Sequence, residues 1–155
     1  MHNALMESSA AETGDASPED LITAVEHLVR YVRLSARAGG LSTAASSALA
    51  RLSREGPQRL TELARAEGVS QPGATQLVTR LERAGLVRRS ADARDGRGVI
   101  VGLTPTGRDV LEQRRAERSR AFQRLLGELT EPERRATGTA LLALARVIED
   151  GRDPV

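Results

Sequence analysis

The chain has no cysteine, no lysine and no tryptophan among its 155 residues, and its only aromatic side chains are one Tyr and one Phe. Without cysteine it has no disulfide, no thiol nucleophile and no thiolate metal ligand. Its two histidines, His2 and His27, lie far apart in the sequence and do not make a histidine metal site. Proteins that hold single-stranded nucleic acid stack bases on aromatic rings, so the shortage of aromatics argues against that class. We expect no metal and no other cofactor.

Long apolar runs are also missing. No stretch approaches the ~20 apolar residues that a membrane-spanning helix needs, and the first residues lack the basic start and apolar stretch of a signal peptide. These absences predict a cytoplasmic protein with no membrane contact. Catalytic patterns are missing as well, because the chain has no clustered histidines, no phosphate-binding loop and no nucleophile elbow. We therefore do not expect an enzyme.

All 23 basic side chains are arginine, the residue favoured for paired contacts to phosphate and guanine. A GC-rich genome, which prefers arginine codons, is the simpler explanation of the missing lysine. The distribution of charge says more than its total of +2. Residues 1–50 carry a net charge of −3, residues 51–97 carry +4 and residues 98–155 carry +1. The positive excess therefore lies in the middle third of the chain.

Apolar periodicity and capping residues predict a mainly α-helical fold with a small β-hairpin. Residues 1–16 and 151–155 are expected to be tails, and residues 17–150 a single domain. The helices are expected at residues 17–37, 42–54, 61–67, 70–84, 104–127 and 130–150. The hairpin is expected to pair residues 86–90 with residues 99–103 across a polar, glycine-containing tip.

The order of these elements predicts a winged helix–turn–helix within residues 42–104. A turn of three residues, Gly68-Val69-Ser70, separates the two central helices, as this motif requires. The expected core beneath the motif is small and apolar: Leu60, Leu63, Ala64, Val69, Ala74, Leu77, Val78 and Leu81.

The second helix of the motif has an outward face of amides, hydroxyls and guanidinium groups. A projection at ~100° per residue places its apolar residues on one side and Pro72, Gln76, Thr79 and Arg83 on the other. Paired donors and acceptors of this kind read base edges in the major groove. An ordinary solvated helix face is the alternative. The hairpin tip carries Arg94 and Arg97, which suit a minor groove, and a solvated loop with balanced charge is the alternative there.

The segment from Gly85 to Arg89 and the segment from Asp92 to Gly107 resemble the signature of the MarR (multiple-antibiotic-resistance regulator) family, as do residues 60–64 and 69–72. The resemblance covers roughly residues 18–150. It implies that Arg97 enters the minor groove and that Asp95 orients it. Ala93 and Gly96 depart from the family pattern, which often has proline and a basic residue at these places.

The sequence thus predicts a regulator that binds double-stranded DNA at a pseudo-palindromic operator. The expected DNA-binding residues are Ser70, Gln71, Pro72, Thr75, Gln76, Thr79, Arg80, Arg83, Arg88, Arg89, Arg94 and Arg97. A homodimer is expected through the terminal helices, residues 17–38 and 105–150, because the last helix has more apolar residues than one stripe requires. The residues expected in the dimer interface are Leu21, Val25, Leu141, Leu144 and Ile148.

The family resemblance further implies a repressor that a small-molecule effector releases, with ligand residues that the sequence does not assign. The alternative is a winged-helix protein-interaction module that does not bind DNA. Such a module would need a reading face depleted of Arg, Gln and Thr, and this face is not depleted.

Overall fold

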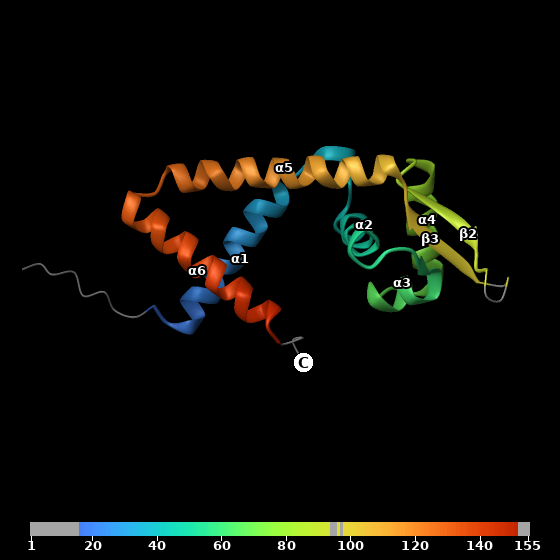
Figure 1. Cartoon of the computed structure of the whole chain (residues 1–155), viewed down its shortest axis with the longest axis horizontal. Coiled ribbons are helices and arrows are strands. Elements are labelled where there is room, and N and C mark those ends of the chain that lie inside the picture. The colour runs from blue at the N-terminus through green and yellow to red at the C-terminus, as the bar shows by residue number, and fades with distance from the viewer. Residues whose placement is uncertain (1–15, 94–95, 97, 152–155) are drawn as a thin grey trace, which may run out of the picture. The chain divides into compact units, whose positions relative to one another are not determined.

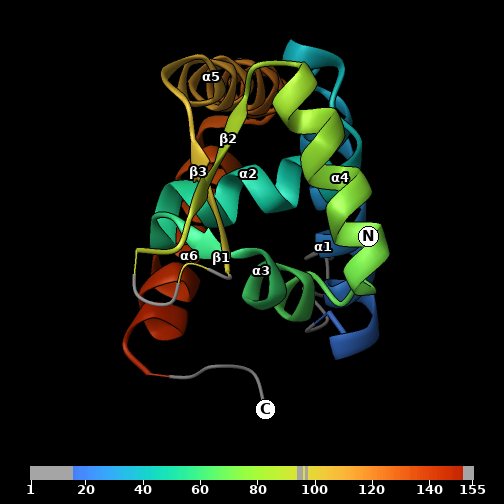
Figure 2. The same cartoon turned by 90° about the vertical axis from the view of Figure 1, so that its right-hand side faces the viewer.

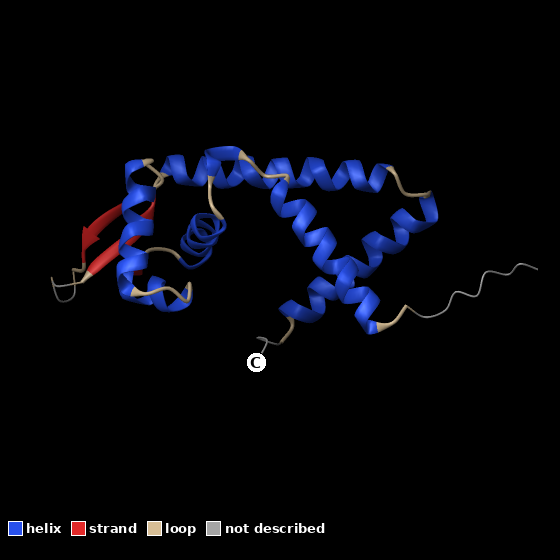
Figure 3. Ribbon diagram, turned by 180° about the vertical axis from the view of Figure 1, so that it is seen from behind, coloured by secondary structure: helices blue, strands red, loops and turns tan. Residues whose placement is uncertain are grey.

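The computed structural model describes residues 16–93, 96 and 98–151 (Figure 1). Its elements follow the order α1 (Pro18–Leu34), η1 (Ala38–Gly40), α2 (Thr43–Glu55), β1 (Gln58–Arg59), α3 (Leu60–Ala66), α4 (Gln71–Arg83), β2 (Val87–Ala91), β3 (Val99–Leu103), α5 (Pro105–Gly127) and α6 (Glu131–Glu149). The chain divides into two units between Tyr31 and Val32, and most of α1 belongs to the first. Figure 3 shows that helices predominate and that the strands form one small group.

The first unit contains an amphipathic helix that begins at a polar cap. The backbone N–H of Asp20 donates to the Ser17 hydroxyl at 3.1 Å, as the sequence predicted for this start. No residue of α1 is buried. Most of its apolar stripe is exposed within this chain, and Leu28 and Val32 are half-buried.

Helix α1 ends at Leu34, so the prediction that it reaches residue 37 was wrong. The cause lies in α5, because a carboxylate oxygen of Glu117 accepts the backbone N–H groups of Arg37 and Ala38 at 2.6 and 3.0 Å. These hydrogen bonds hold the pKa of Glu117 below its ordinary value. The buried Arg114 adds a hydrogen bond to the carbonyl of Ala38 at 2.9 Å. Two side chains of α5 thus fix the segment that precedes α2.

The core of the second unit joins the helix–turn–helix to the sheet. Leu49, Leu63, Val78 and Val101 are fully buried, and they come from α2, α3, α4 and β3 in turn. The core predicted from the sequence is confirmed except at Leu60, which is partly buried and packs against it, and at Val69, which is 36% exposed. Val69 lies in the turn before α4, where its backbone N–H donates to the carbonyl of Ala64 at 3.0 Å. The turn is closed by its backbone, and the Val69 side chain stays at the surface.

The sheet contains the predicted hairpin and one strand that the sequence did not reveal. Its strand order is β1-β3-β2, with both pairs antiparallel. In the hairpin Val87 pairs with Leu103 and Arg89 with Val101. Strand β1 has two residues, too few for an alternating pattern to be seen. Figure 2 shows β2 and β3 running as a narrow ribbon beside α4.

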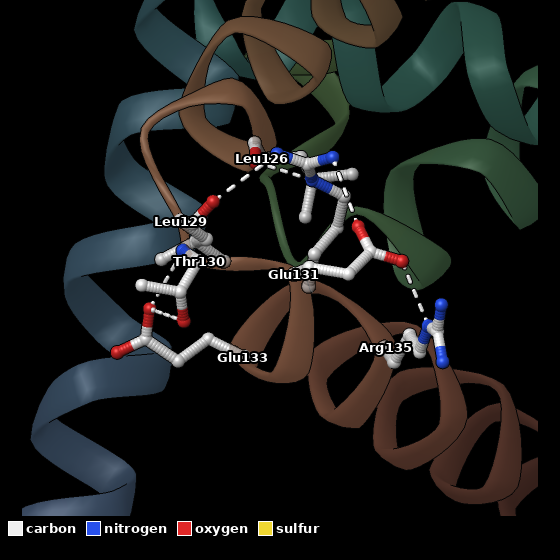
Figure 4. Close-up of polar contacts among 7 residues, drawn as sticks. Leu126, Leu129, Thr130, Glu131, Glu133 and Arg135 are labelled. Atoms are coloured by element: carbon white, nitrogen blue, oxygen red, sulfur yellow. Dashed lines mark hydrogen bonds and ion pairs between the residues drawn. The ribbon is translucent and has the colours of Figure 1, made fainter.

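The corner between α5 and α6 is built from polar contacts (Figure 4). The carboxylate of Glu133 accepts the backbone N–H and the hydroxyl of Thr130, at 2.8 and 2.6 Å. This confirms the predicted capping box at the start of α6. The guanidinium of Arg134 donates to the carbonyl of Leu126 in the last turn of α5 and to the carbonyl of Leu129 in the loop that follows. The corner therefore closes both helix ends that meet there.

Within the described ranges, no helix combines the length and the apolar character needed to cross a membrane. Those same ranges contain no group of three or more His, Asp or Glu side chains that could hold a metal ion.

Candidate DNA interface

Helix α4 is held at both ends by local signals that the sequence predicted. The Ser70 hydroxyl accepts the backbone N–H of Gly73 at 3.2 Å, and Pro72 lies in the first turn. Gly68 and Gly85, on either side of the helix, have φ angles of 63° and 74°. Side chains with a Cβ rarely adopt this left-handed conformation, so glycine allows the chain to turn sharply before and after α4.

The polar face of α4 points away from the core. Ala74, Leu77, Val78 and Leu81 are buried beneath it. The predicted DNA-binding residues on this helix are exposed, apart from the half-buried Thr79: Gln71, Pro72, Thr75, Gln76, Arg80 and Arg83. The N-cap residue Ser70 is exposed as well. The helix therefore presents a continuous polar surface.

Some of these polar groups already have partners within the helix. The hydroxyl of Thr75 donates to the carbonyl of Gln71 at 3.0 Å, and the hydroxyl of Thr79 donates to the carbonyl of Thr75 at 2.8 Å. By contrast, three side chains of the same face make no hydrogen bond or ion pair to another described residue: Gln76, Arg80 and Arg83. Their donors and acceptors are available to a ligand.

The two arginines at the base of the ribbon differ in their surroundings. Arg88 is exposed and has no ion-pair partner among the described residues. Arg89 folds back onto α4, where its guanidinium contacts Glu82 at 2.7 Å and the Thr79 hydroxyl at 2.8 Å. The structure therefore brings Thr75, Thr79 and Arg89 together, and it leaves Arg88 at the surface.

The far end of the ribbon is anchored by Asp92, which is only 5% exposed. Its carboxylate forms an ion pair with the Arg59 guanidinium of β1 at 2.5 Å, and its backbone N–H donates to the carbonyl of Gly98 at 2.8 Å. Sequence reasoning missed this pair because β1 was not recognised. The predicted tip residues Arg94, Asp95 and Arg97 lie outside the described residues.

A hollow of about 470 Å³ lies between α2 and α5. Its charged lining consists of Arg54, Arg108, Arg115, Arg118 and Glu112. Four positive charges against one negative charge make this hollow suited to an anion.

The residues predicted to form a dimer interface are mostly exposed. On α1, Leu21 and Val25 are 56% and 47% exposed. On α6, Leu144 and Ile148 are 57% and 67% exposed, while Leu141 is half-buried. Each helix thus presents large apolar side chains that the described chain leaves uncovered, which is typical of a surface that binds another protein.

Comparison with known proteins agrees with this arrangement. A model of the MarR family matches residues 41–99. An HTH-type transcriptional regulator of Mycobacterium tuberculosis is 31% identical over 128 residues, which are 81% of this chain and 90% of the relative. The crystal structure of a transcriptional regulator from Thermotoga maritima is 25% identical with a TM-score of 0.75, and it covers 85% of this chain and 96% of the other.

A further solved structure is described as explaining how 6-hydroxynicotinic acid regulates DNA binding by BpsR of Bordetella bronchiseptica. It is 26% identical to this chain with a TM-score of 0.52, and it covers 81% of this chain and 95% of BpsR.

Proposed function

This chain belongs to the MarR family of helix–turn–helix transcriptional regulators, and we propose that it represses transcription as a homodimer on a pseudo-palindromic operator. In a dimer with two-fold symmetry the two α4 helices would enter successive major grooves, about one helical turn apart. The proposed role is regulatory rather than enzymatic. The proposed location is the cytoplasm, where the DNA lies.

The observation that carries the proposal is the exposed face of α4. Gln76, Arg80 and Arg83 are exposed, without partners among the described residues, and supported by a buried apolar row on the opposite side of the helix. We propose that Gln76 and Arg80 read bases, while Arg83 and Arg88 bind phosphate. The proposed contacts also include the α4 N-terminus at Ser70, Gln71 and Pro72, and the tip residues Arg94 and Arg97.

Replacing Gln76 by Ala should relax base preference at one symmetric pair of operator positions. A glutamine that donates to and accepts from one base contributes about 1–3 kcal/mol of discrimination, and alanine offers neither group. Selection of binding sites from a random DNA pool, followed by sequencing, measures the information content at every position. The same motif with unchanged information content would show that Gln76 does not read a base.

The matched control is Gln113→Ala, which removes the same amide from an exposed position on α5. This variant should return the wild-type motif. The alternative function, a winged-helix module that binds protein, predicts that the wild-type chain selects no motif at all.

We propose that the arginine-lined hollow between α2 and α5 binds an anionic effector. The support is its charge, together with the regulation of the similar BpsR by an aromatic carboxylic acid. If the hollow is the effector site, Arg115→Ala should weaken the binding of 6-hydroxynicotinate, used as a probe, by about 10-fold or more, since a charged hydrogen bond contributes about 1.5–3 kcal/mol.

Isothermal titration calorimetry measures this affinity directly. Arg135→Ala, on an exposed arginine of α6 outside the hollow, is the control and should bind the probe like the wild type. Equal affinities of both variants and the wild type would contradict the assignment of the hollow.

A further inference from the structure

Arg89 lies in the middle of β2, yet its side chain is directed at α4. Its Nη1 donates to Oε2 of Glu82 at 2.7 Å, while its Nη2 donates to the Thr79 hydroxyl at 2.8 Å and to the Thr75 carbonyl at 3.2 Å. The other carboxylate oxygen of Glu82 accepts the backbone N–H of Arg89 at 3.2 Å. Glu82 therefore binds both the side chain and the backbone of the same strand residue.

The partners of Arg89 follow one face of α4. Residues 75, 79 and 82 are spaced by four and three positions, so they stack on one side of a helix. The guanidinium of Arg89 bridges two turns of that side. We call the contacts of Arg89 with Glu82, Thr79 and Thr75 the wing clasp.

The wing clasp adds a polar link on the surface to the apolar core, in which Val87 and Val101 of the ribbon are buried with the apolar residues of α4. Helix α4 ends at Arg83 and β2 begins at Val87. The backbone between them turns at Gly85 and is held by the Leu86 N–H, which donates to the carbonyl of Leu81 at 2.9 Å. Beyond this turn β2 is an edge strand that pairs only with β3. The wing clasp therefore opposes rotation of the ribbon about the turn.

Stability does not account for this contact. The side chains of Arg89 and Glu82 are 28% and 40% exposed, and ion pairs with that access to water contribute little to the free energy of unfolding. Four hydrogen bonds bind the side chain and the backbone N–H of Arg89 to Glu82, Thr79 and Thr75, and hydrogen bonds of this kind fix geometry because they are directional. Orientation is thus the property that the wing clasp is built to supply.

We propose that Glu82 and Arg89 are positioning residues that set the angle between α4 and the β2–β3 ribbon, so that helix and ribbon reach neighbouring grooves of the operator together. The proposal rests on the DNA-binding function proposed above. It gives Arg89 a role other than the direct DNA contact that the sequence suggests. Arg89 then contributes to discrimination between DNA sequences rather than to general affinity for phosphate.

Whether Glu82→Gln raises or lowers the affinity for DNA distinguishes a positioning role of Glu82 from an effect of its negative charge alone. Glu82 is the one acidic residue of α4. If it acted only through its charge, Glu82→Gln would raise the affinity for every duplex, because repulsion of phosphate would be reduced. If it positions the ribbon, Glu82→Gln lowers the affinity for the operator and does not lower the affinity for unrelated DNA.

The experiment measures the full-length chain by fluorescence anisotropy on two duplexes. One carries the operator found by selection, and the other is a scrambled duplex of equal length and composition. Glu82→Gln and Arg89→Gln should each lower the ratio of the two affinities at least about 5-fold, the loss that one mismatched base pair causes. Because both variants open the same clasp, the double variant should lose little more than either single variant.

Arg88→Gln is the matched control, since Arg88 is the exposed neighbour of Arg89 on the same strand. A side chain that binds phosphate should lower both affinities and reduce the slope of log affinity against log salt by about 1.8 for the dimer, which is about 0.9 for each of its two copies. Arg89→Gln should leave that slope unchanged. If Arg89→Gln instead lowers both affinities and the slope, Arg89 is a phosphate contact and the proposal is overturned.

Hydrogen exchange without DNA separates failure of the clasp from failure of the proposed function. In the free protein Glu82→Gln should accelerate exchange of the Arg89 amide proton, because its acceptor is weakened. A wild type that prefers no duplex would reject the DNA-reading function, while this measurement would still report on the clasp. Unchanged exchange, or an unchanged affinity ratio in a wild type that does discriminate, would overturn the positioning role.

Discussion

Leu144→Asp should convert the dimer into monomers and lower operator affinity by about 10³-fold or more, the ratio that commonly separates specific from non-specific binding. Leu144 is 57% exposed within one chain. Burying an aspartate in an apolar interface leaves a charge without a partner, which is costly enough to prevent association. Each winged helix–turn–helix of the dimer binds one half-site of the operator. A monomer therefore loses all contacts with the other half-site.

Analytical ultracentrifugation at micromolar concentration measures the assembly, and gel-shift titration measures the affinity. Thr139→Asp is the matched control, because Thr139 is exposed on the same helix and lies about 140° around its axis from Leu144. The control should remain dimeric. A wild type that sediments as a monomer and still binds its site tightly would remove both the dimer and the palindromic operator.

Salt dependence provides a second measurement of the same prediction. If a dimer neutralises about 6–10 phosphates, its affinity should fall by roughly 10³–10⁵ between 50 and 200 mM salt. For the Leu144→Asp monomer, the slope of log affinity against log salt should be about half of the wild-type slope, because one winged helix–turn–helix makes half of the phosphate contacts. A monomeric variant with the full wild-type slope would show that the phosphate contacts are not divided between the two protomers.

Gly107→Ala should destabilise the chain by about 3 kcal/mol or more, the upper range for overpacking a core. Gly107 lies in the first turn of α5 and is buried. A Cβ at this position would lie 2.1 Å from the carbonyl oxygen of Leu86 and 2.8 Å from Cδ1 of Leu103. The Leu86 carbonyl accepts the backbone N–H of Thr104 at 3.0 Å. Relieving the clash therefore requires the Leu86 backbone, between α4 and β2, and the start of α5 to move apart.

Urea unfolding followed by circular dichroism measures the difference. Helix propensity acts in the opposite direction, since alanine is favoured over glycine by about 1 kcal/mol inside a helix. Gly138→Ala is the control because a Cβ there meets no atom within 4 Å, and it should raise stability by about 0.5–1 kcal/mol. Equal stabilisation by both substitutions would contradict the close packing at Gly107.

The sequence alone determined those helices and turns whose caps and glycines act on residues only a few positions away. Ser70, Thr104 and Thr130 each begin a helix, and the first two accept a backbone N–H three residues ahead. Gly68 and Gly85 have the positive φ angles that their turns require. Such signals are read from the chain because the hydrogen bond or the steric requirement is local. The order of helices and hairpin followed from them, and the family was indicated by the resemblance of residues 85–89 and 92–107 to the MarR signature.

The tertiary structure alone decided the features whose partners are distant in the chain or separated by a turn. Strand β1 is defined by its pairing with β3, about 40 residues away. Arg59 meets Asp92 only through that sheet, and α1 ends at Leu34 because Glu117 of α5 captures the following backbone. From the sequence, Arg89 is expected to bind phosphate, as arginines commonly do. In the structure, the turn after α4 brings its side chain to Glu82 instead. Side-chain identity fixes which bonds a residue can make, and the packing of distant elements fixes which bond it does make.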